Sequence, residues 1–404
     1  MTFDATGQRR KGGIPRGLSQ TAPVLFSYGF RPFFLGASVW ALVAMVLWLL
    51  SLSGMIDVAT DYGPTYWHAH EMLFGYSSAV LAGFLLTAVP NWTGRLPVSG
   101  WPLFFLFGLW ALGRLAFLFP SIAGAESAAA VDSLFLPVLL AICVREVVAG
   151  RKWKDLKVVG GLAVLSLGNI LFHVQVVTGS HPELAIKLAV SAYVVLVTII
   201  GGRIIPSFTR NWINKTGRTD FPAPYSGFDS AAIVAGIFAL AAWVLLSEGM
   251  LVAALALAAC ILHMVRLFRW RGWTTLAEHL VTVLHVAYLF VPLGFLGIAF
   301  TALGVLSSVA ALHVLTIGTI ASMMLAVMTR ATRGHTGRVL TASPVTSTIY
   351  ATIVLAAVLR PAADLVPDYA HALYGSSGIA WLAAFSLYLW EYGPMLTRTR
   401  RKVA

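Results

Sequence analysis

The chain has 404 residues, of which 58% are hydrophobic and 11% charged, and its formal net charge is +12. Soluble globular proteins carry about 25% charged residues, so the composition indicates an integral membrane protein. The basic residues lie in short stretches between apolar segments, which argues against a nucleic-acid-binding domain. Cys143 and Cys260 both lie in apolar segments, so the chain has no disulfide framework and no CxxCH attachment site for a c-type haem.

Twelve apolar segments are long enough to span a bilayer as helices, which takes about 20 residues. Their approximate ranges are 32–52, 67–90, 101–119, 129–147, 158–178, 184–206, 228–247, 250–268, 275–300, 306–329, 346–360 and 371–392. The eleventh is short. We therefore expect an all-α polytopic membrane bundle with one transmembrane domain over residues 32–392. Residues 1–31 and 393–404 are the expected cytoplasmic tails, and the second of these is basic.

The charges of the connecting segments predict how the helices are oriented. With the N-terminus in the cytoplasm, every second connection is basic, and all but three of the 28 lysines and arginines fall on that side. The exceptions are Arg114, Lys187 and Arg360. The opposite connections hold acids such as Asp57 and Asp364. Both termini are therefore expected in the cytoplasm.

A weak internal repeat suggests three units of four helices. The tripeptide Thr-Gly-Arg follows the second, sixth and tenth apolar segments, and His70 and His313 each lie 23 residues before its threonine. Each of these histidines is followed five residues later by a glycine. The fifth and ninth segments share a similar string around His173 and His285. Such a repeat would make the second and tenth helices equivalent.

Histidines inside the apolar segments are the strongest indication of a functional site. The relevant residues are His68, His70, His173, His285 and His313. An ionisable side chain at membrane depth costs about 2.5 kcal/mol or more unless it has a partner. Neutral imidazole is the commonest ligand for transition metals and a usual ligand for haem iron. We therefore expect a metal or haem site within the bundle.

Register and depth suggest which histidines act together. His70 and His313 share a register near the outer ends of their helices, so we expect them to sandwich a haem. His68, two residues from His70, points in a very different direction on a regular helix and is either a ligand or an interfacial neighbour. His173 and His285 are the expected ligands of a second metal, for which copper is suitable. Polar contacts between helices are the alternative for these histidines.

Two charged residues belong to the same expectation. Glu71 follows His70 directly and is expected to orient an imidazole or to carry protons as a catalytic group, unless it faces interfacial water. Arg114 lies inside the third apolar segment and needs an anion there. A haem propionate would make Arg114 a cofactor-binding residue; an acidic side chain or snorkelling to the interface is the alternative.

Long strings of the sequence resemble the NnrS family. The strongest is WHAHEMLFGY at residues 67–76, continuing to AVPNWTG at 88–94. Further matches are GFRPFF at 29–34, GGRIIPSFTRNW at 201–212 and AVMTR at 326–330, which leads to GHTGR at 334–338. The resemblance covers nearly the whole chain. It implies a bacterial inner-membrane protein with twelve helices that carries haem and copper and is associated with nitric oxide metabolism and nitrosative stress.

The helix count and the possible three-by-four repeat also resemble the catalytic subunit of haem–copper oxidases and nitric oxide reductases. In those proteins the ligands of the low-spin haem come from the second and tenth helices, where His70 and His313 fall here. The chain departs from that pattern because it has no His-His pair on the seventh helix and no His-x-His on the tenth. This second similarity therefore concerns the fold alone.

Three classes of function follow. The first is an oxidoreductase that uses haem b and copper to bind, and in the strongest form to reduce, nitric oxide with electrons from an unidentified donor. The second is a protein that binds or moves metal, haem or a nitrosyl complex without turnover. The third is a secondary transporter with a polar path through the bundle. The expected partners are the lipid bilayer and nitric oxide or a related small molecule, without nucleic acid.

Overall fold

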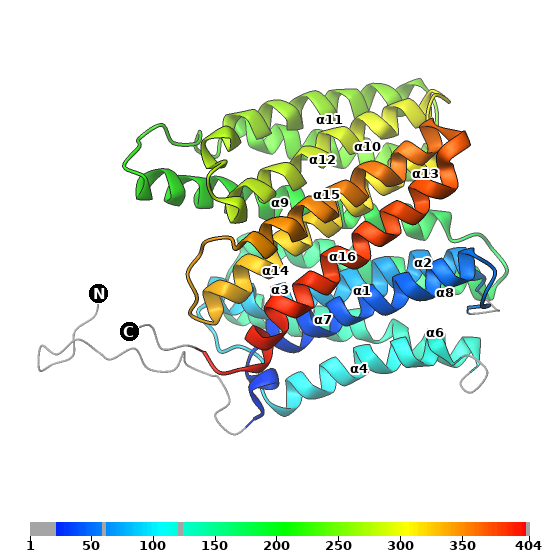
Figure 1. Cartoon of the computed structure of the whole chain (residues 1–404), viewed down its shortest axis with the longest axis horizontal. Helices are drawn as coiled ribbons and strands as arrows, with labels where there is room; N and C mark the ends of the chain where they lie inside the picture. Colours follow the sequence, from blue (N-terminus) through cyan, green and yellow to red (C-terminus); the bar gives the residue numbers. More distant parts are fainter. Residues whose placement is uncertain (1–21, 59–61, 120–123, 401–404) are drawn as a thin grey trace, which may run out of the picture.

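The protein is a bundle of long helices. The computed structural model describes residues 22–58, 62–119 and 124–400, and this part of the chain contains no strand. Twelve of its helical stretches are long and apolar enough to cross a membrane, and they run along the long axis of the molecule (Figure 1). The predicted all-α bundle of twelve spans is confirmed, and the chain is a multi-pass membrane protein.

The twelve spans comprise more than twelve helical elements, because five of them contain a break or a change of helix type. The first six spans are α1 (Phe30–Leu52), α2 with η2 and α3 (Pro64–His70, Glu71–Ser77, Ser78–Thr93), α4 (Trp101–Leu118), α6 with α7 (Ala125–Ser133, Phe135–Ala149), η3 with α8 (Trp153–Asp155, Leu156–Val177) and α9 (Glu183–Lys215). The last six are α10 (Gly227–Leu246), α11 (Met250–Arg269), α12 (His279–Ala302), α13 with η5 and α14 (Ser308–His313, Val314–Ala321, Ser322–His335), α15 (Pro344–Leu365) and η6 with α16 (Pro367–Tyr369, Ala370–Thr397). Short 3-10 turns, η1 (Val24–Ser27) and η4 (Gly272–Thr275), precede α1 and α12.

The boundaries differ from the sequence-based ranges at a few ends. The eleventh span, expected to be short, is the 22-residue helix α15. Helix α1 begins at Phe30 and α16 ends at Thr397, so each enters the range expected for a tail. The expected tails 1–31 and 393–404 otherwise fall in large part on residues 1–21 and 401–404, outside the described residues.

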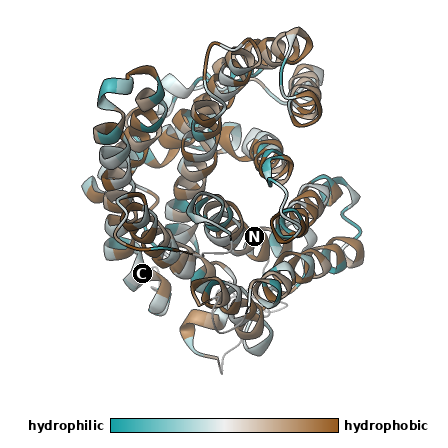
Figure 2. Ribbon diagram, turned by 90° about the vertical axis from the view of Figure 1, so that its right-hand side faces the viewer, coloured by the Kyte–Doolittle hydropathy of each residue, from teal (hydrophilic) through white to brown (hydrophobic). Residues whose placement is uncertain are grey.

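The most buried spans identify the centre of the bundle. Within the most apolar part of each span, 83% of residues are buried in the second span, 72% in α12 and 67% in α9. The corresponding share is 33% in α4, α10 and α11, which carry exposed apolar side chains such as Phe105 and Ile261. Seen along the helices, most of the ribbon is hydrophobic (Figure 2). Exposed apolar side chains over the length of a helix are expected of a surface that faces lipid.

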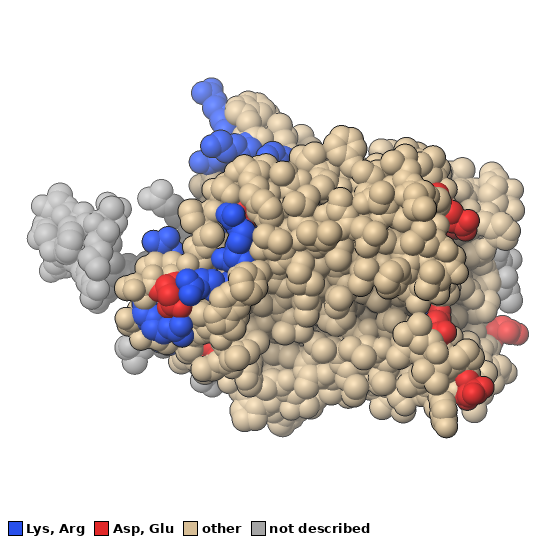
Figure 3. All heavy atoms as spheres, turned by 90° about the horizontal axis from the view of Figure 1, so that it is seen from above, with Lys and Arg blue, Asp and Glu red and all other residues tan. Residues whose placement is uncertain are grey.

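Charge is distributed unequally between the two ends of the bundle. Lysines and arginines gather at the end where α1 begins and α16 ends, whereas the charged residues seen at the opposite end are acids (Figure 3). We refer to these as the basic end and the acidic end. The alternation of basic and acidic connections along the sequence thus corresponds to two faces of the structure.

The structure supports part of the internal repeat. Each Thr-Gly-Arg tripeptide ends a helix with its glycine in the left-handed region, with φ of 73° at Gly94, 75° at Gly217 and 73° at Gly337. The π-helical segments η2 and η5 begin directly after His70 and His313. The match between the fifth and ninth spans is wrong, because His173 lies 17 residues after the start of α8 and His285 six residues after the start of α12.

Candidate functional site: a buried histidine cluster and a neighbouring cavity

Helix α2 directs two histidines to two different places. His68 lines a cavity, whereas His70 is fully buried in a cluster of polar side chains on the other side of the helix. Residues two apart on a helix point about 200° apart around its axis, so one short helix can serve both places. The sequence-based expectation that these two imidazoles diverge is confirmed.

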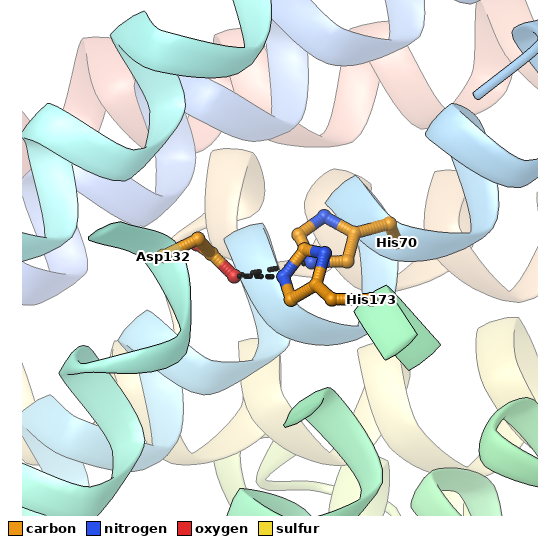
Figure 4. Close-up of side chains that lie close together, drawn as sticks. All are labelled: His70, Asp132 and His173. Carbon is orange, nitrogen blue, oxygen red and sulfur yellow. Dashed lines mark hydrogen bonds and ion pairs between the residues drawn. The ribbon is translucent and has the colours of Figure 1, made fainter. Parts of the chain in front are cut away.

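The buried cluster brings together three groups that bind metals. Nε2 of His70 lies 3.1 Å from Oδ2 of Asp132, and Nε2 of His173 lies 2.9 Å from the same oxygen (Figure 4). One potential ligand atom from each residue lies within 4.8 Å of the other two. The three residues come from α2, α6 and α8, and all are buried.

Further polar side chains hold the rings of this cluster in place. Glu71 places one carboxylate oxygen 2.9 Å from Nδ1 of His70 and the other 2.5 Å from a guanidinium nitrogen of Arg114. Arg114 also forms an ion pair with Asp132. The carboxylate, the guanidinium and the imidazole are therefore locked together in one network without direct access to solvent.

Asn169 and Tyr62 complete the shell around the cluster. The amide of Asn169 donates to Asp132 at 2.9 Å, which leaves its carbonyl oxygen 3.1 Å from Nε2 of His70. The hydroxyl of Tyr62 lies 2.9 Å from Nδ1 of His173. Because each imidazole has one nitrogen tied to a polar partner, the other nitrogen is directed toward Asp132.

The charges of the cluster do not balance. With both carboxylates ionised and both imidazoles neutral, Glu71 and Asp132 supply two negative charges against the one positive charge of Arg114, and one negative charge is left over. An uncompensated charge buried at membrane depth is costly. With Nδ1 of His70 donating to Glu71, its Nε2 lone pair would also face two oxygen acceptors. A cation between these atoms, either a metal ion or a proton on an imidazole, resolves both conflicts.

The backbone of η2 makes room for the network. A Cβ atom on Gly75 would lie 2.6 Å from both a guanidinium nitrogen of Arg114 and a carboxylate oxygen of Glu71. The carbonyl of Gly75 accepts a hydrogen bond from Trp110 at 2.9 Å. Ser77 closes the segment by donating to the carbonyl of Met72, five residues earlier. π-Helical turns of this kind occur frequently at functional sites.

A cavity of about 330 Å³ lies on the other side of α2. Its walls come from α1, the second span, α13 with η5, α15 and α16. It therefore lies between the second and tenth spans. The walls are largely apolar and aromatic, and His68, His313 and Arg360 are the basic residues that line it. Few polar groups in an apolar cavity of this size are typical of a small-molecule or cofactor site.

The two histidines of the cavity have different environments. Nδ1 of His313 donates to the carbonyl of Val309 at 2.8 Å, which leaves Nε2 as the nitrogen with the free lone pair. Haem and metal ligands commonly make such a hydrogen bond with their other nitrogen. The ring of His68 stacks on Trp48 at 4.4 Å, and its buried Nδ1 has no hydrogen-bond partner. Both imidazoles therefore have a nitrogen available to a ligand.

The structure corrects two of the expected pairs. His70 does not line the cavity with His313; it is enclosed by Asp132 and His173, and His68 takes its place beside His313. His173 and His285 lie at opposite ends of the bundle. His173 contacts Tyr62 before α2, whereas the ring of His285 packs against Gly272 between α11 and α12 and bonds to Thr209 at 2.8 Å. The two histidines are far apart because His173 lies near the end of α8, whereas His285 lies near the beginning of α12.

The structure also bears on the expected roles of Arg114 and Glu71. Arg114 does not reach the cavity, and its anions are the acidic side chains of Glu71 and Asp132 rather than a haem propionate. Glu71 is 0% exposed, contacts His70 and does not line the cavity. Its position matches the expectation that it orients an imidazole, because its carboxylate lies 2.9 Å from Nδ1 of His70.

Several functional residues escaped the sequence analysis. Asp132 and Asn169 interrupt the fourth and fifth apolar segments, and Asp132 is an acid at membrane depth of the kind that marks functional sites. Arg360 is an exception to the alternation of charge along the sequence, and this exception alone does not indicate a function. No sequence signal marks Tyr62, because it precedes the second segment and reaches His173 only through the fold.

The fold and the site define a class of protein: a polytopic helical membrane protein with a buried His-Asp-His cluster and a cofactor-sized cavity between its second and tenth spans. The chain belongs to the NnrS protein family, whose sequence profile matches residues 24–400. Membership places it among membrane proteins linked to the nitric oxide response. No curated protein matches the chain.

Proposed function

We propose that the protein binds nitric oxide at a haem held in the cavity, and that the buried cluster holds a copper ion that supports this site. The observation that carries the proposal is the arrangement on the two sides of α2. One side has two imidazoles and a carboxylate around an excess negative charge, and the other has two imidazoles in an apolar cavity. Both belong to a protein of the NnrS family.

The chemistry of the cluster favours a transition metal over a hard cation. Imidazole nitrogen suits copper, whereas calcium and magnesium prefer oxygen ligands. His70, His173 and Asp132 would bind the ion, and Glu71 and Tyr62 would fix the orientation of the two rings. A metal cation also neutralises the charge that Arg114 leaves unpaired.

The chemistry of the cavity favours haem b. His313, whose Nδ1 donates to the carbonyl of Val309, would hold the iron through Nε2, and His68 would be available to a diatomic molecule in the same cavity. Arg360 lines the same cavity and would hold a propionate in place of Arg114. Haem supplies an iron that binds nitric oxide once it is reduced. The volume of about 330 Å³ lies at the lower end of the range for ligand sites.

The structure favours binding over reduction of two nitric oxide molecules. The cluster is closed by its own side chains and does not line the cavity, so a copper ion there has no open position for a second molecule. We therefore place binding or sequestration in nitrosative stress defence ahead of turnover. Electrons for reduction of the haem come from a donor outside this chain.

The proposed location is the bacterial inner membrane with both termini in the cytoplasm. The distribution of charge supports it, because the basic end is the expected cytoplasmic face. A reporter fused after Thr219, in the basic connection between α9 and α10, should be active only if it is a cytoplasmic reporter. Activity of a periplasmic reporter there would contradict the proposed orientation and indicate the opposite one.

A double dissociation tests the two sites. His313→Ala should abolish the haem Soret band and spare copper, whereas His70→Ala and His173→Ala should lower copper and spare haem. His279→Ala is the control, because His279 lies outside both sites and forms a hydrogen bond with Ser347. Haem is measured as pyridine haemochrome and copper by mass spectrometry of the purified proteins. Loss of haem in His70→Ala with retention in His313→Ala would overturn the assignment.

Nitric oxide added to the reduced wild-type protein should shift the Soret band, and His68→Ala should change the affinity while retaining the haem. Absence of any spectral response would refute nitric oxide binding. Formation of nitrous oxide with a chemical reductant would show that the protein also reduces nitric oxide and would favour the hypothesis of an oxidoreductase.

A further inference from the structure

The mouth of the cavity is built from the ends of five spans. Leu52 near the end of α1, Thr65 near the start of α2 and Val309 near the start of α13 are exposed and line the cavity. Arg360 near the end of α15 and Tyr374 near the start of α16 line it as well. Because α1 begins at the basic end and ends at this mouth, the cavity opens toward the acidic end.

Asp364 lies about one helical turn beyond Arg360 on α15 and does not itself line the cavity. Its Oδ1 atom accepts a hydrogen bond from the guanidinium of Arg360 at 3.3 Å and another from the hydroxyl of Tyr374 at 3.3 Å. The centre of the guanidinium lies 4.2 Å from the centroid of the ring of Tyr374. One carboxylate oxygen and one aromatic ring therefore hold Arg360 in place at the mouth.

The pair of Arg360 and Asp364 engages only part of the guanidinium. A guanidinium carries five N–H donors, and the hydrogen bond to Asp364 uses one of them. The distance of 3.3 Å is long for a charge-assisted hydrogen bond, which usually measures about 2.7–2.9 Å. Asp364 therefore orients Arg360 without occupying it fully, and further donors are available to an anionic group in the cavity.

The other carboxylate oxygen of Asp364 serves a different helix. Oδ2 accepts a hydrogen bond from the hydroxyl of Ser307, the N-cap residue of α13. The oxygen of this hydroxyl in turn accepts a hydrogen bond from the backbone N–H of Ala310 at 3.0 Å. Since a serine hydroxyl has a single proton, its donation to Asp364 leaves the lone pairs for that N–H. Asp364 therefore fixes the start of α13 against α15.

Helix α13 carries His313, and its shortness makes the cap important. It has six residues before η5 begins, and so short a helix has little stability of its own. Nδ1 of His313 donates to the carbonyl of Val309, which lies two residues after Ser307. The cap, this carbonyl and the imidazole thus lie within about two turns of one helix. A displacement of Ser307 would therefore displace the imidazole.

We propose that Asp364 is a positioning residue for the cofactor of the cavity. Through Oδ1 it holds Arg360, which would bind a propionate, and through Oδ2 it holds the helix of His313, which would bind the iron. This role toward the cofactor rests on the proposed function, whereas the support of α13 stands on the hydrogen bonds alone. One carboxylate thereby fixes the two groups that grip the haem relative to each other.

Hydrogen exchange of the purified full-length protein tests the support of α13. Ser307→Ala and Asp364→Ala should each speed amide exchange over residues 308–313 about 5- to 30-fold, the effect of losing a helix cap. Ser307→Thr keeps a capping hydroxyl and should restore the wild-type rate. Asp368→Asn is the control, because Asp368 is an exposed acid in η6 just after α15. Unchanged exchange in both alanine variants overturns the proposal, whatever cofactor the protein contains.

Haem binding tests the separate roles of the two oxygens. Asp364→Asn keeps an acceptor for Ser307 and loses the charge that faces Arg360, so it should leave the exchange of α13 near the wild-type rate. It should release haem to a scavenging protein about 10- to 100-fold faster.

Ser307→Ala should instead shift the iron–histidine vibration in resonance Raman spectra of the reduced protein, because the helix of His313 is no longer fixed. An unshifted vibration in Ser307→Ala, or unchanged haem release in Asp364→Asn, contradicts the positioning role. Absence of haem from the wild-type protein refutes the proposed function instead, and hydrogen exchange then decides whether Asp364 supports α13.

Discussion

The two sides of α2 solve the problem of a polar group inside a membrane in opposite ways. In the buried cluster, His70 is surrounded by charged and polar side chains that contact one another at 2.5–3.1 Å. In the cavity, His68 and His313 stand among apolar walls with open volume before them. A dense polar cluster without space suits a small ion, whereas an apolar space with few donors suits a large apolar cofactor. The residue types are the same, and the surroundings decide the ligand.

The largest expected effect concerns Arg114, whose guanidinium is the only cationic side chain of the buried cluster. Arg114→Met should destabilise the protein by about 3–5 kcal/mol, because it leaves Glu71 and Asp132 buried without their partner. Thermal unfolding in detergent, followed by tryptophan fluorescence, measures the effect. Arg95→Met is the control: its guanidinium pairs with Glu146 at a partly exposed position, where such a pair contributes less than about 1 kcal/mol. Equal effects of the two changes would contradict a charge-based cluster.

Gly75 tests whether the cluster lacks space. Gly75→Ala should cost about 1–3 kcal/mol, because the added methyl group meets Arg114 and Glu71 at 2.6 Å. It should also lower copper content without loss of haem. Gly108→Ala on α4 is the matched change, because no atom lies within 4 Å of the added Cβ. That variant should be neutral or slightly more stable. Tolerance of alanine at position 75 would show that the cluster can expand.

Tyr62 tests the outer support of the cluster. Tyr62→Phe removes the hydroxyl that holds Nδ1 of His173, so copper affinity should fall about 10- to 100-fold while haem remains. Competition with a copper chelator measures the affinity. Tyr66→Phe, which loses a hydrogen bond to the exposed His181, should leave copper unchanged. An effect of similar size in both variants would indicate that the segment containing Tyr62 and Tyr66 as a whole, rather than the hydroxyl of Tyr62, supports the copper site.

His285 should give the smallest effect, because it belongs to neither side of α2. His285→Gln should cost about 1 kcal/mol, the usual contribution of a hydrogen bond such as the one to Thr209. Copper and haem contents of the purified variant should equal those of the wild type. A loss of copper would reinstate His285 as a ligand.

The sequence was sufficient to predict an all-α bundle of twelve spans, because membrane helices can be recognised from their length and hydropathy alone. It also pointed to the second and tenth spans as the place of a haem site, and the cavity described above is lined by residues of both spans. It paired His70 rather than His68 with His313, because register specifies a position along a helix, whereas the direction of a side chain depends on the neighbouring helices. Asp132 and Tyr62 reach the cluster from α6 and from the connection before α2, and contacts of this kind arise only in the folded bundle.

The π-helical segment η2 makes this arrangement sensitive to chain length. A π turn holds one residue more than an α turn, so removal of a single residue within Glu71–Ser77 would allow the span to close as a continuous α-helix. The part of the chain before it would then turn by about 100° about the helix axis. His68 and His70 would leave both sites at once, although every ligand would still be present. In this protein a one-residue deletion would therefore be more damaging than any single substitution of a ligand.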